Sequence, residues 1–146
     1  MIDSILVVCE GNVCRSPMAQ ALLAKQLPGV SVTSAGCAAA VGRAADPMAV
    51  KLMAEREIDI GGHIAVDLTV HHLRSAQLVL SMTQAQRRQI ETTFPFATGK
   101  VYRLGERDGI DVLDPYRRER AAFETALAQI ERGVSYWLDA MVRLTQ

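Results

Sequence analysis

Residues 5–16 read ILVVCEGNVCRS and decide the fold of this 146-residue chain. The apolar run 5–8 is typical of a buried strand, and residues 17–23, PMAQALL, read as the beginning of a helix. A strand, a tight turn and a helix in this order gather backbone N–H groups and the positive end of the helix around one point, which favours an anion. Cys9 begins the turn and Arg15 lies near its end. The pattern predicts a phosphate-binding loop between the first strand and the first helix.

The side chains of this loop have distinct expected roles. We expect Cys9 to be a nucleophile, because the local field favours its thiolate, and Arg15 to clamp two oxygens of a phosphoryl group. Ser16 is expected to donate a hydrogen bond to the Cys9 thiolate, to cap the helix, or to do both. The backbone of five further residues is expected to bind the phosphoryl group: Glu10, Gly11, Asn12, Val13 and Cys14. The alternative is that Cys9 is only a buried strand-end residue and Arg15 a surface charge.

Composition limits the class of protein. Sixteen basic and sixteen acidic residues give a formal net charge of zero, which provides no electrostatic case for binding nucleic acid or an anionic membrane. No apolar run approaches the length of a membrane span, so no membrane insertion is expected. Three cysteines without a disulfide pattern suit a reducing cytoplasm. We therefore expect one cytoplasmic domain, residues 1–146, without a metal or another cofactor.

Apolar runs alternate with helical patterns along the chain. Strands are expected at Ser4–Cys9, Val30–Ser34, Gln77–Met82 and Lys100–Leu104. Helices are expected at Pro17–Leu27, at Met48–Glu57 with Asp46 as its cap, from a Thr83 cap through Glu91, and at about Arg118–Leu144. This alternation predicts an α/β fold with a four-stranded parallel sheet and helices on both faces.

Two distant motifs carry a resemblance to a known family. Residues 8–17, VCEGNVCRSP, resemble the signature of the low-molecular-weight protein tyrosine phosphatases, and residues 113–116, LDPY, resemble the general-acid loop of that family. Residues 34–36, 42–47 and 62–65 also match in family order, so the resemblance covers essentially the whole chain. The residues of these motifs are most similar to those of the bacterial branch of the family, which is linked to exopolysaccharide and capsule production.

The resemblance implies a mechanism and a set of site residues. Cys9 would form a cysteinyl-phosphate intermediate, and Asp114 would protonate the leaving phenolate and later activate water; Asp108 and Asp111 are rival acids on the same loop. Tyr116 would form one wall for the substrate ring. His63 would brace the loop from behind, and Asn12 would hold its shape.

Four departures from the family pattern have expected consequences. Glu10 stands where an apolar residue is usual and should disfavour acidic substrates. Val66 stands where the family often has Arg, which puts a supporting hydrogen bond in doubt, and Cys37 replaces a small polar residue. The segment Gly36–Ala45 has no aromatic residue, so the second wall must be aliphatic, with Val41 as the candidate.

The implied substrate is a phosphotyrosyl protein, the autophosphorylated tyrosine-rich tail of a bacterial kinase of polysaccharide export, with the chain acting as a monomer or a weak dimer. Three alternatives stand beside this interpretation. A thiol-dependent arsenate reductase would need a late cysteine pair, and no cysteine follows Cys37. A metal-binding module that used Cys9 and Cys14 would need a second, similarly spaced pair of ligands, which the sequence does not contain. A non-catalytic phosphotyrosine-binding module would not need a nucleophile and an acid. We also expect Cys9 and Cys14 to form a disulfide after oxidation.

Overall fold

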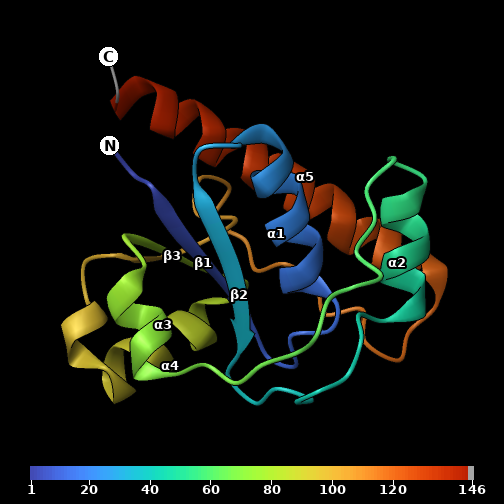
Figure 1. Ribbon diagram of the computed structural model, residues 1–146, viewed down its shortest axis with the longest axis horizontal. Helices are drawn as coiled ribbons and strands as arrows, with labels where there is room; N and C mark the ends of the chain where they lie inside the picture. The colour runs from blue at the N-terminus through green and yellow to red at the C-terminus, as the bar shows by residue number, and fades with distance from the viewer. Residues whose placement is uncertain (145–146) are drawn as a thin grey trace.

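The sheet of the computed structural model, which describes residues 1–144, has four parallel strands in the order β2-β1-β3-β4 (Figure 1). The strands are β1 (Ser4–Cys9), β2 (Ser31–Gly36), β3 (Leu78–Ser81) and β4 (Val101–Arg103). β1 pairs with β2 on one side and β3 on the other, so the strand order reverses at its carboxyl end. Ligands of open α/β sheets bind at such a point, which is where the turn after Cys9 lies.

Helices cover both faces of the sheet, as predicted. One face carries α1 (Arg15–Gln26), α2 (Pro47–Ala54) and α5 (Arg120–Leu144). The other carries α3 (Val70–Ser75), α4 (Gln84–Thr93) and the short 3-10 helix η1 (Pro95–Ala97). Alternate residues of β1 enter the two cores: Ile5 and Val7 pack with α1 and α5, and Leu6 and Val8 pack on the opposite side. β1 is therefore buried on both sides, which explains its uninterrupted apolar sequence.

The long last helix α5 contributes one apolar face to the larger core. Apolar residues recur along this helix at spacings of three and four and form a buried stripe, in which Phe123, Leu127 and Ile130 are at most 2% exposed. Burial of each such side chain contributes roughly 1.5–3 kcal/mol. Gly133 lies where α5 meets the end of β4, and a Cβ there would approach the Leu104 carbonyl oxygen to 2.7 Å. This close approach brings the helix against the segment that follows β4.

The predicted caps are present. The Asp46 carboxylate accepts a hydrogen bond from Met48 N at 2.9 Å, and Thr83 forms a capping box with Gln86 at the beginning of α4. The helix expected to end at Glu57 ends at Ala54, and Glu57 adopts a left-handed φ of 62°. The last helix begins at Arg120 rather than about Arg118, because residues 115–118 form a turn closed from Arg118 N to Pro115 O.

The short helices α3 and η1 were not predicted, since neither is long enough to show a helical period. The last two residues of the expected domain, 145–146, lie outside the described residues. Within residues 1–144, no helix combines the length and the apolar character needed to cross a membrane.

Candidate active site

Asn12 is the centre of the turn between β1 and α1, which we call the Cys9 loop (residues 9–16). Asn12 is fully buried and has a left-handed φ of 59°. Its side-chain amide donates to Ser16 Oγ at 2.8 Å and to Ser34 Oγ at 3.0 Å, and its Oδ1 accepts from Val66 N at 3.0 Å. Every polar atom of this side chain therefore has a partner, and the partners come from three different segments.

The Asn12 backbone connects the loop to His63 and to Cys9. His63 Nε2 lies 2.7 Å from the Asn12 carbonyl oxygen, so the expected brace is in contact with the loop. Val66 supports the loop through its backbone N–H, which donates to Asn12 Oδ1. This hydrogen bond does not depend on the side chain at position 66, so it is present although Val stands where the family often has Arg.

The Cys9 sulfur receives two polar contacts. Asn12 N donates to Sγ at 3.3 Å, and Ser16 Oγ lies 2.9 Å from Sγ. Because Ser16 Oγ already accepts from the Asn12 amide, its hydroxyl hydrogen is free to point at the sulfur. Both contacts can therefore direct a hydrogen at this one sulfur atom. The interpretation of Ser16 as the helix cap is wrong, since α1 begins at Arg15 and its N-cap residue is Cys14.

Arg15 lies at the base of the site and is only 3% exposed. Its Nη1 donates to the Val112 carbonyl oxygen at 3.1 Å, and its Nη2 lies 3.6 Å from Asp114 Oδ2. These two contacts connect the Cys9 loop to the segment between β4 and α5, which we call the Asp114 loop (residues 104–119). The rigid guanidinium therefore keeps a fixed orientation at the floor of the site.

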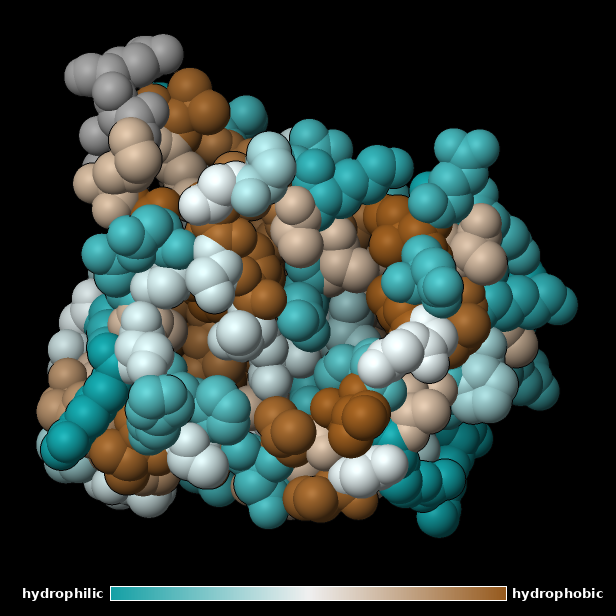
Figure 2. Space-filling view, in the orientation of Figure 1, coloured by the Kyte–Doolittle hydropathy of each residue, from teal (hydrophilic) through white to brown (hydrophobic). Residues whose placement is uncertain are grey.

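A cavity of about 260 Å³ opens between the two loops. Gly11 and Arg15 of the Cys9 loop line it, together with Asp114 and Tyr116 of the Asp114 loop. Small side chains of the connection after β2, Ala38 and Ala40, also line it. The expectation of Val41 as the second wall is wrong: Val41 is 62% exposed and does not line the cavity. Figure 2 shows hydrophobic residues over the connection after β2. The wall is nevertheless aliphatic.

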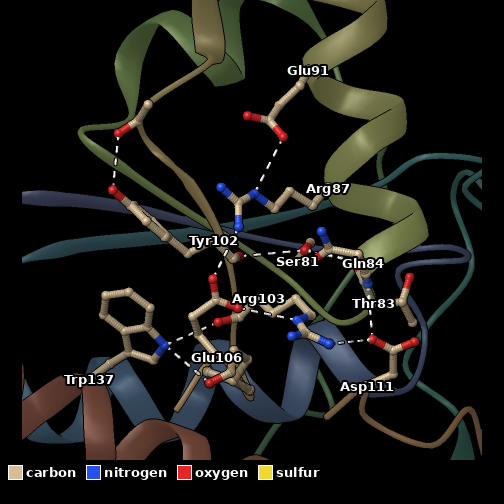
Figure 3. A network of polar contacts seen from close by, with 12 residues as sticks. Ser81, Thr83, Gln84, Arg87, Glu91, Tyr102, Arg103, Glu106, Asp111 and Trp137 are labelled. Carbon is tan, nitrogen blue, oxygen red and sulfur yellow. Dashed lines mark hydrogen bonds and ion pairs between the residues drawn. The ribbon is translucent and has the colours of Figure 1, made fainter. Parts of the chain in front are cut away.

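The rival acids are engaged elsewhere in ion pairs. Asp108 pairs with Arg132 of α5 at 2.7 Å, and the hydrogen bond from that guanidinium lowers the pKa of Asp108. Asp111 accepts from Gln84 N at 3.0 Å and from Arg103 Nη1 at 3.2 Å (Figure 3). Of the three carboxylates, Asp114 alone lines the cavity.

Two further cysteines lie near Cys9. Burial raises the pKa of the Cys14 thiol far above its ordinary value, and the neighbouring Asp46 and Cys9 raise it further. Burial raises the pKa of Cys37 to about 11, with smaller contributions from Cys9 and Glu10. Both thiols are therefore protonated near neutral pH, unlike a nucleophile that must be ionised.

Several groups that position the site were not predicted from the sequence. They include the Val112 carbonyl, which accepts from Arg15, and Gln129 of α5, whose Oε1 accepts from Leu113 N at 2.8 Å. Ser34 of β2 also contributes, since it links Asn12 to Gln20 by a hydrogen bond of 2.6 Å. A backbone carbonyl carries no residue-type signal, and single Ser and Gln residues are too common to indicate a role. Gly36 is different, because a glycine in the sequence can indicate a close approach of two backbone segments. A Cβ at this position would lie 2.6 Å from the Glu10 carbonyl oxygen.

Comparison with known proteins agrees with this geometry. The model of the family "Low molecular weight phosphotyrosine protein phosphatase" matches residues 4–146. The chain is 55% identical over 138 residues to a probable low molecular weight protein-tyrosine-phosphatase, EpsP, of Ralstonia solanacearum, covering 94% of this chain and 95% of that protein.

Two solved structures share the fold along nearly the whole chain. The tyrosine phosphatase Wzb from Escherichia coli K30, in complex with sulphate, has a TM-score of 0.93 at 34% identity, covering 97% of this chain and 99% of that one. The YwlE arginine phosphatase from Geobacillus stearothermophilus has a TM-score of 0.90 at 35% identity, covering 97% and 94%. The chain belongs to the low molecular weight phosphotyrosine protein phosphatase family.

Proposed function

We propose that this enzyme hydrolyses phosphotyrosine on a protein through a phosphorylated Cys9. The observation that carries the proposal is a cavity of about 260 Å³ that is lined by the buried Arg15, by Asp114 and by residues 10, 11, 13 and 14 of the loop that Cys9 begins. Tyr116 offers an aromatic wall to the substrate ring. Val13 and Ala40 supply the apolar remainder.

The first chemical step transfers the phosphoryl group to sulfur. Cys9 Sγ attacks phosphorus, the S–P bond forms, and the bond from phosphorus to the tyrosine oxygen breaks. Arg15 and the backbone N–H groups of the Cys9 loop stabilise the charge on the equatorial oxygens. Asp114 gives its proton to the departing oxygen, since a phenol has a pKa of about 10 and its anion leaves slowly without one.

The second step returns the enzyme to its first state. Asp114, now ionised, takes a proton from a water molecule that attacks phosphorus. The S–P bond breaks, and phosphate and the Cys9 thiolate are released. Ser16 and the Asn12 N–H stabilise that thiolate through the contacts at 2.9 and 3.3 Å.

The test is hydrolysis of phenyl phosphate and of a phosphotyrosyl peptide by the wild type and by Cys9→Ser. We expect activity from the wild type and none from a folded Cys9→Ser chain. A phosphoarginine peptide is the matched competitor, because one structural neighbour is an arginine phosphatase. We expect the tyrosine peptide to be preferred, since Tyr116 together with Val13, Ala38 and Ala40 gives the cavity aromatic and aliphatic surface for a ring. Activity retained by Cys9→Ser would exclude the mechanism, and preference for phosphoarginine would exclude the substrate.

The proposed physiological substrate is an autophosphorylated tyrosine kinase of polysaccharide export, met in the cytoplasm by a monomeric phosphatase. Support comes from the resemblance of the motifs at residues 8–17 and 113–116 to the bacterial exopolysaccharide branch. A Cys9→Ser chain used as a trap in cell extract should retain the phosphoprotein. Retention of an unrelated phosphoprotein and no such kinase would contradict this assignment.

A further inference from the structure

The cleft at the active site continues beyond the cavity that holds Tyr116. A second hollow of about 400 Å³ shares Glu10, Arg15, Ala38 and Asp114 with the first and extends toward the beginning of α4. We call it the α4 lobe. Its additional lining is uncharged and includes Thr83, Ala85 and Gln89, the last two being exposed.

The charged groups of the α4 lobe differ in how far they are already paired. Arg15 is buried and committed to the Val112 carbonyl and to Asp114. The Glu10 side chain is exposed, and within residues 1–144 it has no hydrogen bond or ion pair to another side chain. Glu10 is therefore a solvated carboxylate at the boundary of the two hollows.

The beginning of α4 does not offset this negative charge. Gln84 N donates to the Asp111 carboxylate at 3.0 Å, and Gln86 N donates to Thr83 Oγ1 at 3.1 Å. These side-chain oxygens occupy the helix terminus, so an incoming anion would have to displace them. The lobe is consequently suited to a cation rather than to an acidic group.

We propose that the α4 lobe binds a cationic side chain, Arg or Lys, next to phosphotyrosine in the substrate, and that Glu10 is the residue that selects it. This inference rests on the proposed function, since it assumes that the phosphotyrosine ring lies against Tyr116. A residue adjacent to that phosphotyrosine emerges at the mouth of the cavity, where the shared residues Glu10 and Ala38 lead into the α4 lobe. An ion pair with Glu10 forms in partly exposed surroundings and contributes a modest, salt-sensitive preference.

The experiment compares phosphotyrosyl peptides that differ only in having Arg, Gln or Glu beside the phosphotyrosine, placed before it in one series and after it in another. For the wild type at low ionic strength we expect kcat/KM to fall in the order Arg, Gln, Glu in at least one series, with a span of about three- to tenfold carried by KM. High salt should compress that span. Gln89→Lys places a cation in the α4 lobe and should reduce or reverse the preference for Arg over Glu peptides.

Glu10→Gln is the decisive variant, and the measured quantity is the ratio between peptides rather than the absolute rate. For this variant we expect the kcat/KM values of the Arg and Glu peptides to differ by no more than about twofold. Asp139→Asn removes an exposed carboxylate of α5 that lines neither hollow and should keep the wild-type ratio. An unchanged ratio in Glu10→Gln, or a wild-type preference for Glu peptides, would overturn the inference.

Two controls separate this inference from the proposed function. Hydrolysis of phenyl phosphate, which has no flanking residue, tests the chemistry alone. Affinities of the same peptides for the Cys9→Ser chain give the order of preference without turnover. If phenyl phosphate is not hydrolysed but the Cys9→Ser chain still prefers Arg peptides, only the proposed mechanism is refuted. If the Cys9→Ser chain binds all the peptides with equal affinity, only the role of the α4 lobe is refuted.

Discussion

Two loops face the same cavity, but the surrounding structure holds them differently. In the Cys9 loop, Asn12 and Ser16 are fully buried and Arg15 nearly so, and contacts from β2, His63 and Val66 fix the backbone. In the Asp114 loop, the Asp114 side chain is 47% exposed, and its contacts are Tyr116 N at 3.1 Å and Arg15 at 3.6 Å. The anion site is rigid, whereas the proton donor is open to solvent.

The difference matches the two tasks. Stabilising a charged transition state requires donors that do not reorganise, and burial keeps them fixed. A group that gives a proton to one oxygen and later takes a proton from water needs access to both. The Asp114 loop is anchored just before Asp114, through Val112 N to Met82 O at 2.9 Å and Leu113 N to Gln129, whereas Asp114 itself and residues 116–119 are exposed.

Arg15→Ala should have the largest effect, because it removes the anion clamp and also the contacts that join the two loops. We expect kcat to fall by roughly 10³-fold or more. Arg15→Lys is the matched control: it keeps the charge but loses the planar fork, and we expect partial activity. Kinetics with phenyl phosphate measure both variants. A folded Arg15→Ala chain with more than a tenth of wild-type kcat would contradict the role of the clamp.

Asp114→Ala should separate the proton donor from the rigid loop. With phenyl phosphate we expect a loss of roughly 10²–10⁴-fold in kcat, and a much smaller loss with esters of strongly acidic phenols, whose anions leave without a proton. Asp108→Asn and Asp111→Asn should lose less than about tenfold, because both carboxylates are paired away from the cavity. Equal losses with both esters, or a larger loss from either control, would identify another acid.

Asn12→Gly and Arg117→Gly compare the two loops at positions with nearly the same left-handed φ, 59° and 61°. Glycine accepts this backbone, so each change isolates the contribution of the side chain. Asn12→Gly leaves buried partners unsatisfied and should lower the free energy of unfolding by roughly 2–4 kcal/mol. Arg117 is exposed, and its replacement should change stability by less than about 1 kcal/mol. Urea unfolding measures the free energy of unfolding of both variants. Equal losses of stability in the two would contradict the difference between the loops.

Oxidation should produce a reversible effect. We expect peroxide to inactivate the wild type, bound phosphate to protect it, and a dithiol to restore activity through a disulfide between Cys9 and Cys14. Because the pKa of Cys14 is raised, its attacking thiolate is scarce near neutrality, and the rate of disulfide formation should rise with pH. Cys14→Ser should recover less than the wild type, whereas Cys37→Ser should recover normally.

Mass spectrometry of the oxidised chain would identify the bridge. A disulfide from Cys9 to Cys37, or full recovery of Cys14→Ser, would show that Cys14 is only a buried loop residue.

The sequence was sufficient for features that depend on residue type at fixed spacing. The apolar run before Cys9, the Asp46 and Thr83 caps and the stripe containing Phe123 each predicted an element that the structure contains. The strand order was not predicted, because parallel pairing joins segments such as 4–9 and 78–81 that no local pattern connects. Short elements such as α3 also carry too little periodicity.

The site was predictable where a side chain performs the task and not where the backbone does. Cys9, Arg15 and Asp114 were expected to share a site; Arg15 and Asp114 line one cavity, and Cys9 begins the loop that supplies four more of its lining residues. The Val112 carbonyl and the Val66 N–H were missed, since any residue supplies these groups. Val41 was expected to be the aliphatic wall, but Ala38 and Ala40 line the cavity, because the sequence does not show in which direction each side chain of this segment points.

Trp137 is the single tryptophan of the chain, and its position makes it an internal optical probe. Its indole N–H donates to the carbonyl oxygens of Arg103 and Leu104, at 3.3 and 3.1 Å, where the Asp114 loop leaves β4 (Figure 3). Indole emission depends on the polarity and hydrogen bonding around the ring. Displacement of the base of this loop therefore changes the fluorescence of one defined residue, so that its movement during substrate binding can be followed in the unlabelled protein.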